Sequence, residues 1–330
     1  MAASAPPVSV RREGAFAGLR RAIGGQEMIL LLGLVLLFVV VGSLNPRFLA
    51  ERNLETIFLG NAYVAVAAIG MSMVIVSGNI DVSVGSLIGV LATISGSIAV
   101  AGWPIWVSWL APVLAGIVIT MAWGALVAYL NIPSIVVSLG MLSILKGGLI
   151  IATGGAWISN LPPGYALAQM EPLGIAMPIW FMVILTAGAA FWMRYAPTGR
   201  AIYAVGGNPE AARLSGISKQ RILMTVFGLH GAFAGIAAVL FATQLSVIQS
   251  TVPPGLELSV ITASVVGGVS ILGGVGTVIG STLAAVLLAA IASALIFINV
   301  SPYWIRAVQG VLILVTVLAD LIRRRRERSG

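Results

Sequence analysis

Long apolar runs separated by short polar or glycine-rich connections make up most of the chain after residue 27. A helix that crosses a bilayer needs about 20 predominantly apolar residues, so each run near that length predicts one span. We therefore expect an all-α fold, a polytopic membrane bundle of about ten helices. The expected spans lie near residues 28–44, 54–77, 86–102, 107–130, 134–153, 177–194, 221–244, 258–272, 278–298 and 304–322.

Two glycine-rich breaks, at 78–85 and 273–277, are the least regular parts of this pattern. Irregular backbone at membrane depth is tolerated only where it lies against protein or lines a water-filled cavity. We therefore allow that either break lies within the bilayer instead of beyond it. Two longer connections are also expected, at 154–176 and 195–220.

Basic residues indicate the orientation of the bundle, because Lys and Arg accumulate in cytoplasmic loops. With the N-terminus inside, 14 of the 18 basic residues fall on the cytoplasmic side, three fall outside, and Lys146 lies within a span. An odd number of helices would place one terminal basic cluster on the wrong side. We expect both termini in the cytoplasm, with residues 1–27 as an N-terminal tail, 28–322 as the membrane domain and 323–330 as a basic tail. No small-residue cleavage site follows the first run, which favours a retained anchor.

Composition excludes several classes of protein. The 330-residue chain is 59% hydrophobic and 8% charged, whereas soluble domains carry about 25% charged residues. The absence of cysteine removes disulfides and thiolate chemistry, and the single histidine, His230, removes a histidine-based metal cluster. The net charge of +8 is divided among membrane flanks instead of forming one basic face, so we expect contact with lipid and none with nucleic acid.

Residues 195–221 form the longest polar stretch expected on the cytoplasmic side, and they predict a short helix. Asn208 suits the N-cap, Pro209 the first helical position and Glu210 the positive end of the helix dipole, and Gly216 ends the helix. These residues alone are also compatible with an ordinary capped helix in a loop between two spans.

Three strings carry a resemblance to a known family. Glu210-Ala211-Ala212 followed by Gly216 resembles the EAAxxxG cytoplasmic loop of ABC import permeases, which docks into a cleft on a separate ATPase subunit. GRAIYAVGGNPEAARLSGI, SGNIDVSVGS at 77–86 and ASVVGGVSILGGVGTVIGST at 263–282 resemble the ribose-type, monosaccharide branch of these permeases. The similarity extends from about residue 28 to 322.

This resemblance implies the permease subunit of a bacterial ABC importer that carries a monosaccharide or sugar-like solute across the inner membrane. It implies a second permease subunit, identical or a sister chain, an ABC ATPase and a periplasmic or lipid-anchored sugar-binding protein. The solute stays open among a pentose, a deoxyhexose such as rhamnose, a polyol and autoinducer-2, because the strings resemble rhamnose and autoinducer-2 permeases as well as ribose ones. The ATPase-coupling residues that it implies are Gly199, Arg200, Gly207, Asn208, Pro209, Glu210, Ala211, Ala212, Arg213 and Gly216.

The sequence contains no GxxxxGK[ST] phosphate loop, so we expect no ATPase site in this chain. ATP and Mg²⁺ are then expected on the partner ATPase, with no cofactor in this chain and no covalent chemistry. Arg200 and Arg213 are candidates to pair with acidic groups on that partner, or serve only as positive-inside anchors.

Asp81 lies between apolar runs, and an intramembrane acid is a functional-site hypothesis by default. The alternative is that it caps a helix starting near Val82. Lys146 interrupts another apolar run, and it either snorkels, pairs with Asp81 or Glu257, or contacts solute. His230 is expected to be packed and hydrogen-bonded between small residues, although its titration range keeps a proton-coupling role open.

A neutral, hydroxyl-rich solute favours uncharged hydrogen-bonding groups along its path, and dense glycines allow tight packing or a moving break. The glycine string is not a nucleotide-binding fingerprint, because no strand precedes it. The residues expected on the path or at a gate are Asn61, Asn79, Asp81, Ser83, Gly85, Gln244, Glu257, Gly267, Gly268, Gly273 and Gly274. The outer segments 154–172 and 246–257, which carry Trp157 and Tyr165, are either docking surface for a binding protein or interfacial anchors.

Two other functions fit the sequence less well than an importer permease. An ion-coupled secondary carrier would recruit Asp81, Lys146, His230 and Glu257 for the coupling ion. A membrane enzyme would need paired acids or a histidine-containing set, and the chain has two aspartates and one histidine.

Overall fold

The computed structural model describes residues 25–244, 246–251, 253–301 and 303–329, with side chains described as far as residue 322. This part of the chain is almost entirely helical. The α-helices are α2 Gln26–Leu44, α3 Glu51–Val76, α4 Val84–Val100, α5 Ile105–Tyr129, α6 Ser134–Thr153, α7 Met177–Tyr195, α8 Pro197–Gly207, α9 Pro209–Leu214, α10 Lys219–Ala242, α11 Leu256–Val266, α12 Val278–Phe297 and α13 Trp304–Ser329. Short 3₁₀ turns lie at Pro46–Leu49, Leu167–Gln169 and Pro172–Gly174.

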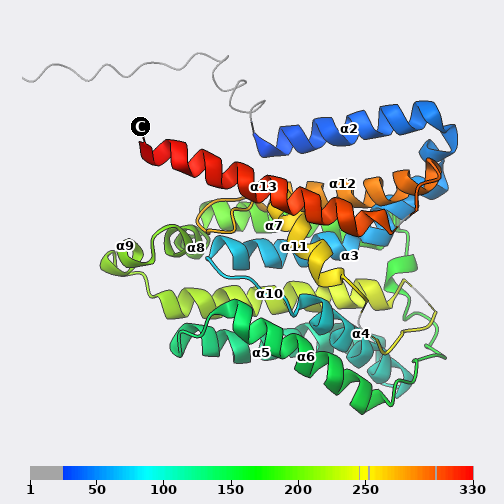
Figure 1. Cartoon of the computed structure of the whole chain (residues 1–330). Coiled ribbons are helices and arrows are strands. Elements are labelled where there is room, and N and C mark those ends of the chain that lie inside the picture. The colour runs from blue at the N-terminus through cyan, green and yellow to red at the C-terminus, as the bar shows by residue number, and fades with distance from the viewer. Residues whose placement is uncertain (1–24, 245, 252, 302, 330) are drawn as a thin grey trace, which may run out of the picture.

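Eight of the described helices are long and apolar enough to cross a membrane, namely α2, α3, α5, α6, α7, α10, α12 and α13. They run alongside one another, and α8, α9 and the end of α13 lie at the same end of the bundle, on the left of Figure 1. We refer to this as the α9 end and to the other as the outer end. The expected polytopic helical bundle is confirmed.

Two further apolar helices, α4 and α11, are shorter than a span. They have 17 and 11 residues, which at about 1.5 Å per residue reach about 25 and 16 Å, less than the roughly 30 Å of the hydrocarbon core. The expected helix at 258–272 is therefore wrong at its C-terminal end. Gly268 adopts a φ of +92°, which a residue with a Cβ rarely adopts, and the chain leaves the helix there.

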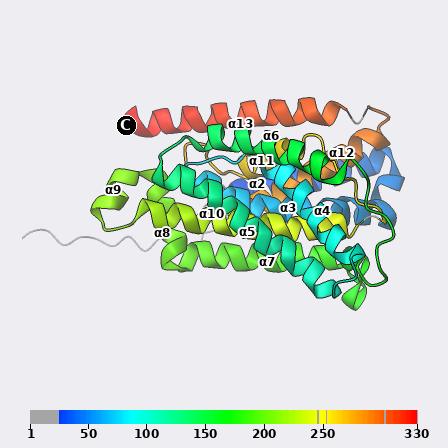
Figure 2. The same cartoon turned by 90° about the horizontal axis from the view of Figure 1, so that it is seen from below.

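The buried centre of the bundle is formed by α3, α10 and α12, the spans with the largest buried share. Seen from below, α13 follows one edge of the molecule and α7 the opposite edge, with α3 between them (Figure 2). Small residues bring the central helices into backbone contact: a Cβ added to Gly235 of α10 would lie 2.5 Å from the Cα of Val113 in α5. Close approach of this kind stabilises helix pairs in lipid through dispersion contacts.

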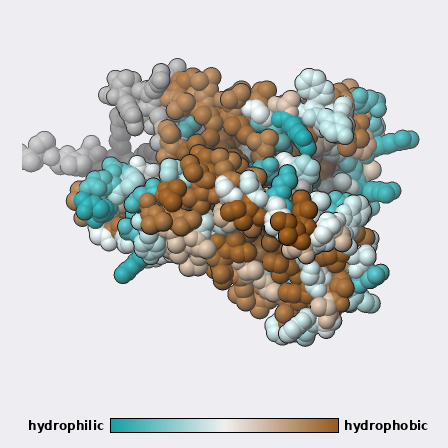
Figure 3. Space-filling view, turned by 60° about the horizontal axis from the view of Figure 1, so that its bottom comes forward, coloured by the Kyte–Doolittle hydropathy of each residue, from teal (hydrophilic) through white to brown (hydrophobic). Residues whose placement is uncertain are grey.

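The surface agrees with a membrane orientation. In Figure 3 apolar side chains dominate the middle of the visible face, and hydrophilic ones gather mainly at the two ends. Of the described basic residues, Arg194, Arg200, Arg213, Lys219 and Arg221 belong to the α9 end, and Arg47, Arg52 and Arg306 to the outer end. This is the division that the positive-inside rule predicts for a cytoplasmic α9 end.

The two expected tails differ in how far they are described. The N-terminal tail 1–27 lies outside the described residues as far as residue 24. The helix expected to stop at 322 continues through the expected basic tail, because α13 extends to Ser329.

Candidate functional site

Two breaks in the apolar helices, at 77–83 after α3 and at 267–277 after α11, begin with the same cap. Gly78 and Gly268 have φ values of +83° and +92°. In each break the glycine N–H and the next N–H donate to carbonyl oxygens of the last helical turn, as in a Schellman motif. The two breaks thus begin with the same local structure.

The two breaks meet at the C-terminal end of α8. The N–H of Gly274 donates to the carbonyl oxygen of Val76 at 2.8 Å, and a Cβ added to Gly206 would overlap that same oxygen. A Cβ on Gly273 would lie 2.7 Å from the carbonyl oxygen of Gly206. We name this backbone cluster the glycine junction. Its members are Val76, Gly78, Gly206, Gly207, Gly273 and Gly274.

A side-chain contact also ties α8 to the second break. The hydroxyl of Tyr203 donates to the carbonyl oxygen of Gly276 at 2.9 Å. Burial raises the pKa of Tyr203 above its ordinary value, so the phenol remains a neutral donor at physiological pH. Helix α8 is thus held to the break by a side chain as well as by backbone contacts.

Helix α9 forms as the sequence predicts. The Asn208 side chain accepts from the N–H of Ala211 at 3.0 Å, and Gly216 ends the helix with a φ of +81°. Ala212 is buried, whereas Leu214 is 75% exposed. The helix therefore displays most of its surface at the α9 end.

The two charged side chains of α9, Glu210 and Arg213, form an ion pair with each other. Arg213 donates to both carboxylate oxygens of Glu210, at 2.6 and 3.1 Å. This pairing lowers the pKa of Glu210 below its ordinary value. Arg200 is exposed and donates to the carbonyl oxygen of Tyr195 at 3.1 Å.

The sequence pattern predicts a connection before Asn208, but the structure has the helix α8 there. Pro197 occupies its first helical position, and Ile202 and Val205 are buried three residues apart. Pro followed by apolar residues at helical spacing is the signal that identifies such a helix. Gly199 permits the sharp turn from α7, because a Cβ there would lie 2.7 Å from the Cα of Met193.

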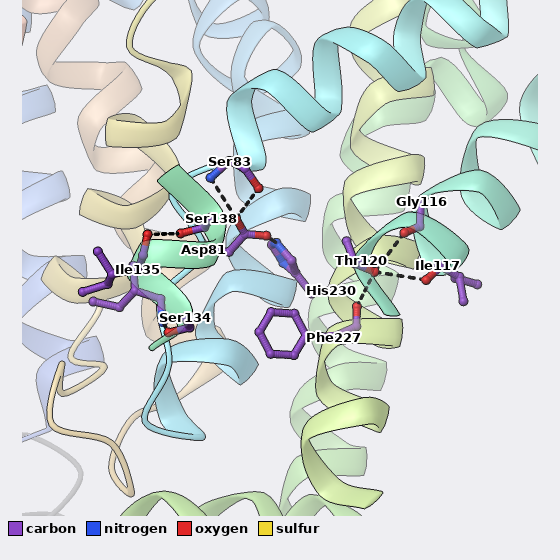
Figure 4. A network of polar contacts seen from close by, with 11 residues as sticks. Asp81, Ser83, Gly116, Ile117, Thr120, Ser134, Ile135, Ser138, Phe227 and His230 are labelled. Atoms are coloured by element: carbon purple, nitrogen blue, oxygen red, sulfur yellow. Dashed lines mark hydrogen bonds and ion pairs between the residues drawn. The ribbon is translucent and has the colours of Figure 1, made fainter. Parts of the chain in front are cut away.

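Asp81 belongs to the first break, is fully buried and faces His230 of α10 (Figure 4). One carboxylate oxygen accepts from the N–H of Ser83 at 2.8 Å and also from the Ser83 hydroxyl. The other oxygen lies 3.1 Å from Nε2 of His230, which is equally buried. Because a carboxylate only accepts, this geometry favours the tautomer with the proton on Nε2.

Asp81 is not the N-cap of the following helix, and a functional role for it stays a prediction. Helix α4 begins at Val84 with Ser83 as N-cap, so Asp81 lies two residues before the cap while it satisfies the N–H of Ser83. His230 is packed and hydrogen-bonded, as expected, although its Nδ1 is buried without a hydrogen-bond partner among the described residues.

Neighbouring helices hold this region in place. The N–H of Ile80 donates to the hydroxyl of Ser134 at the start of α6, at 3.1 Å. On α5, the hydroxyl of Thr120 lies 2.7 Å from the carbonyl oxygen of Phe227, one turn before His230 (Figure 4). The first break is therefore attached to α6 and α10 by polar contacts.

Several of the expected path residues lie at the two breaks or beside them. Asn79 donates to the carbonyl oxygen and hydroxyl of Ser77. Gly85 and Glu257 are in contact, since a Cβ on Gly85 would lie 2.6 Å from a carboxylate oxygen of Glu257. Gly267 packs against the start of α12, where a Cβ would lie 2.5 Å from the Cα of Ser281.

Other expected residues lie elsewhere. Asn61 borders a cavity near the outer end, and Gln244 donates to the carbonyl oxygen of Leu59. Lys146 is exposed on α6. Its suggested pairing with Asp81 is wrong, because the structure pairs that carboxylate with His230.

The outer segments are joined by one antiparallel bridge, between Ile158 and Ile248. Trp157 is exposed, but Tyr165 is buried and donates to the hydroxyl of Ser95 at 2.8 Å. The assignment of Tyr165 to a docking surface is therefore wrong, because its ring packs inside the protein. Burial raises the pKa of Tyr165 to about 12.

Comparison with known proteins identifies the family. A family model described as "Branched-chain amino acid transport system / permease component" matches residues 53–317. The chain is 37% identical over 298 residues to the autoinducer 2 import system permease protein LsrC of Salmonella typhi, which covers 89% of this chain and 85% of that protein. The protein of the same name from Escherichia coli (strain K12 / DH10B) is 35% identical, over 89% of this chain and 86% of its own. No solved structure matches. The chain therefore belongs to this family of transport-system permease components.

Proposed function

We propose that this chain is the membrane-spanning subunit of an ATP-driven importer in a bacterial inner membrane. Its solute is small, neutral and rich in hydroxyl groups, of the autoinducer-2 or monosaccharide class. The relatives that are about as long as this chain are named for autoinducer 2, which supports this class. The family description names branched-chain amino acids instead. We give more weight to the relatives, because they match individually over 89% of the chain.

One observation carries the proposal: an exposed helix at the cytoplasmic end is connected by backbone contacts to both helix breaks. Helix α9 follows α8 directly, with Asn208 between them. Gly206, near the end of α8, contacts Val76 before the first break and Gly274 within the second. A force applied to α9 therefore reaches both broken helices through α8.

The ATPase is a separate subunit in this proposal, and ATP and Mg²⁺ bind there. It docks on α9, where Leu214 and the Glu210–Arg213 pair are exposed. Closure of two ATPases around ATP moves α8 and α9 of each permease subunit. The glycine junction then shifts the two breaks relative to one another, and access to the solute alternates between the two sides.

The outer end receives a solute-binding protein. The segment around Trp157 is exposed there and is attached to the bundle by the Ile158–Ile248 bridge. An exposed tryptophan on an anchored segment is a suitable contact for a partner, because Trp is enriched at the centres of protein interfaces.

The test is co-purification of the tagged chain from its native membrane after mild extraction, followed by identification of the accompanying chains and an uptake assay. An ATPase and a solute-binding protein are expected, together with uptake that requires ATP. A chain that purifies alone, with uptake that collapses with the proton gradient, would instead establish an ion-coupled carrier.

A matched pair of variants tests the docking site on α9. Leu214→Asp places a charge on the exposed apolar position of α9, and we expect at least a tenfold loss of co-purified ATPase. Leu173→Asp makes the same change at a residue that is 90% exposed in an outer loop, and should leave the ATPase bound. Equal retention by both variants would exclude α9 as the docking helix.

A further inference from the structure

We infer that a cavity near the outer end, bounded by α3, α11, α12 and α13, is a binding station for the solute inside the membrane domain. This inference rests on the proposed importer function and identifies where its solute binds. The cavity has a volume of about 220 Å³. Its polar side chains include Asn61, Ser259 and Gln309.

The position of the cavity suits a solute that arrives from outside. Ser259 lies in the first turn of α11, and Gln309 lies in the second turn of α13, both close to the outer ends of these helices. Pro253 and Pro254 line the cavity from the outer segment, and Pro254 is exposed. The cavity therefore lies toward the outer side of the membrane domain.

The polar groups of the cavity have hydrogen-bonding capacity left over. Gln309 is 6% exposed, and its Nε2 donates to the hydroxyl of Ser259 at 3.1 Å. Among the described residues, nothing donates to the Gln309 carbonyl oxygen, and the half-buried side chain of Asn61 makes no hydrogen bond. These two amides therefore have hydrogen-bonding capacity available to a bound molecule or to water.

The chemistry of the wall selects a neutral polyol. Among the described residues that line the cavity, none is charged, and a buried ion without a partner would cost several kcal/mol. An amino-acid zwitterion is disfavoured for the same reason. Amides both donate and accept, as hydroxyl groups do, so two amides recognise a polyol without selecting a charge.

The remaining wall is apolar and has little side-chain bulk on one side. Val64, Leu256 and Leu288 face the cavity together with small alanines of α12, and such surface accommodates the C–H faces of a sugar ring. The cavity volume is smaller than the roughly 300–1,000 Å³ of sites for drug-sized ligands, which fits a solute no larger than a monosaccharide.

The cavity is also connected to the breaks. Helix α11 begins beside the cavity at Leu256 and ends at Val266, directly before the second break. A shift of that break therefore moves one wall of the cavity along with α11. The binding station thus lies at the start of α11, and the break that follows the end of α11 leads to the glycine junction.

The absence of cysteine from the chain permits a direct test. Asn61→Cys and Ser259→Cys, each the only thiol, are assembled in the full transporter and treated from outside with a neutral, hydroxyl-bearing methanethiosulfonate reagent. We expect labelling at least tenfold faster than at Leu314→Cys, an apolar position of α13 that is 71% exposed on the bundle surface and faces lipid in the proposed orientation. Ribose and autoinducer 2 are then added, and the imported solute should slow labelling at both cavity positions.

Labelling no faster than at Leu314→Cys, or no slower with the solute that the wild-type importer carries, would overturn the binding station. In a second test, Gln309→Leu should raise the KM of uptake at least tenfold while the ATPase activity of the assembled complex is unchanged. Gln220→Leu, which changes an exposed amide at the start of α10, away from the outer end, is the matched control. An unchanged KM in Gln309→Leu would also contradict the inference.

The importer proposal and the position of the binding station can be contradicted separately. If wild-type uptake does not depend on ATP, the importer proposal is wrong, whatever the labelling shows. If uptake depends on ATP but the cavity thiols are unreactive or unprotected, the importer proposal stands and the position of the binding station is wrong.

Discussion

Asp81 is a fully buried carboxylate, and both of its oxygens have hydrogen-bonding partners. Ser83 supplies two donors and His230 a third. A buried acid without partners would cost several kcal/mol, so these contacts decide whether the break at 77–83 keeps its position against α10. The residue thus connects a segment of irregular backbone to the buried centre.

We expect Asp81→Ala to destabilise the protein by about 3 kcal/mol or more, because the change leaves the buried His230 without its partner. Asp81→Asn retains one acceptor and should lose less. Asn79→Ala, which removes only local contacts with Ser77, is the control in the same break. Thermal unfolding in detergent, followed by tryptophan fluorescence, measures the three variants. Equal midpoints for Asp81→Ala and Asn79→Ala would contradict this account.

The Glu210–Arg213 pair leads to a prediction about pH. The guanidinium of Arg213 holds the pKa of Glu210 below its ordinary value, so the carboxylate is charged at neutral pH. The contribution of the Glu210–Arg213 pair to folding stability is fully present above the pKa that Glu210 has in the unfolded chain. It is lost as the pH falls through the lower pKa that Glu210 has in the folded protein. Between about pH 5.5 and 8, ATPase binding to wild type and to Glu210→Gln should therefore follow parallel pH curves. A step near neutral pH that Glu210→Gln removes would show that the carboxylate titrates there.

At the scale of elements, the decisive contacts are between backbones. The breaks after α3 and α11 share one kind of cap and meet at α8. There the close packing requires glycine at 206, and positive φ values also favour glycine at 273 and 274. Gly206 and Gly207 both lie beside Gly274, yet only a Cβ on Gly206 would overlap a neighbouring backbone, that of Val76. A Cβ on Gly207 would find its nearest neighbour, Gly274 Cα, at 3.8 Å.

This difference gives a matched pair of variants. Gly206→Ala should force α8 away from Val76, and we expect at least a tenfold loss of ATP-dependent uptake while the protein still inserts into the membrane. Gly207→Ala adds the same methyl group at ordinary van der Waals distance and should retain most of the uptake. The measurement is initial uptake normalised to the amount of membrane-embedded protein. Similar uptake by the two variants would mean that the junction does not transmit movement.

Most elements were predictable because their signals are local. Apolar runs located the spans, and Asn208, Pro209 and Gly216 located α9. The end of α11 was not, because Val269, Ile271 and Leu272 continue the apolar run beyond Gly268, and only the positive φ of that glycine shows where the helix stops. Helix α8 was missed because the chain around it is only moderately apolar, and its buried side depends on contacts with the two breaks.

At the scale of the whole molecule, the orientation followed from charge counting, because basic residues report which end faces the cytoplasm. The candidate site was only partly accessible from sequence. Asp81 and His230 were each singled out, but they lie 149 positions apart, and no local pattern shows that they meet. The same holds for Gly85 with Glu257, and for Asn61 with Gln309 at the cavity. Pairs of this kind arise from the packing of distant helices, which one sequence does not encode in any short segment.

The glycine junction has a further consequence for how small a movement the molecule can use. Where two elements touch through side chains, a small displacement is absorbed because the side chains adjust their rotamers. The carbonyl of Val76 and the backbone of Gly206 and Gly274 have no rotamers to adjust. A displacement of α8 smaller than a carbon–carbon bond would therefore already move both broken helices, and its timing would follow the ATPase without delay.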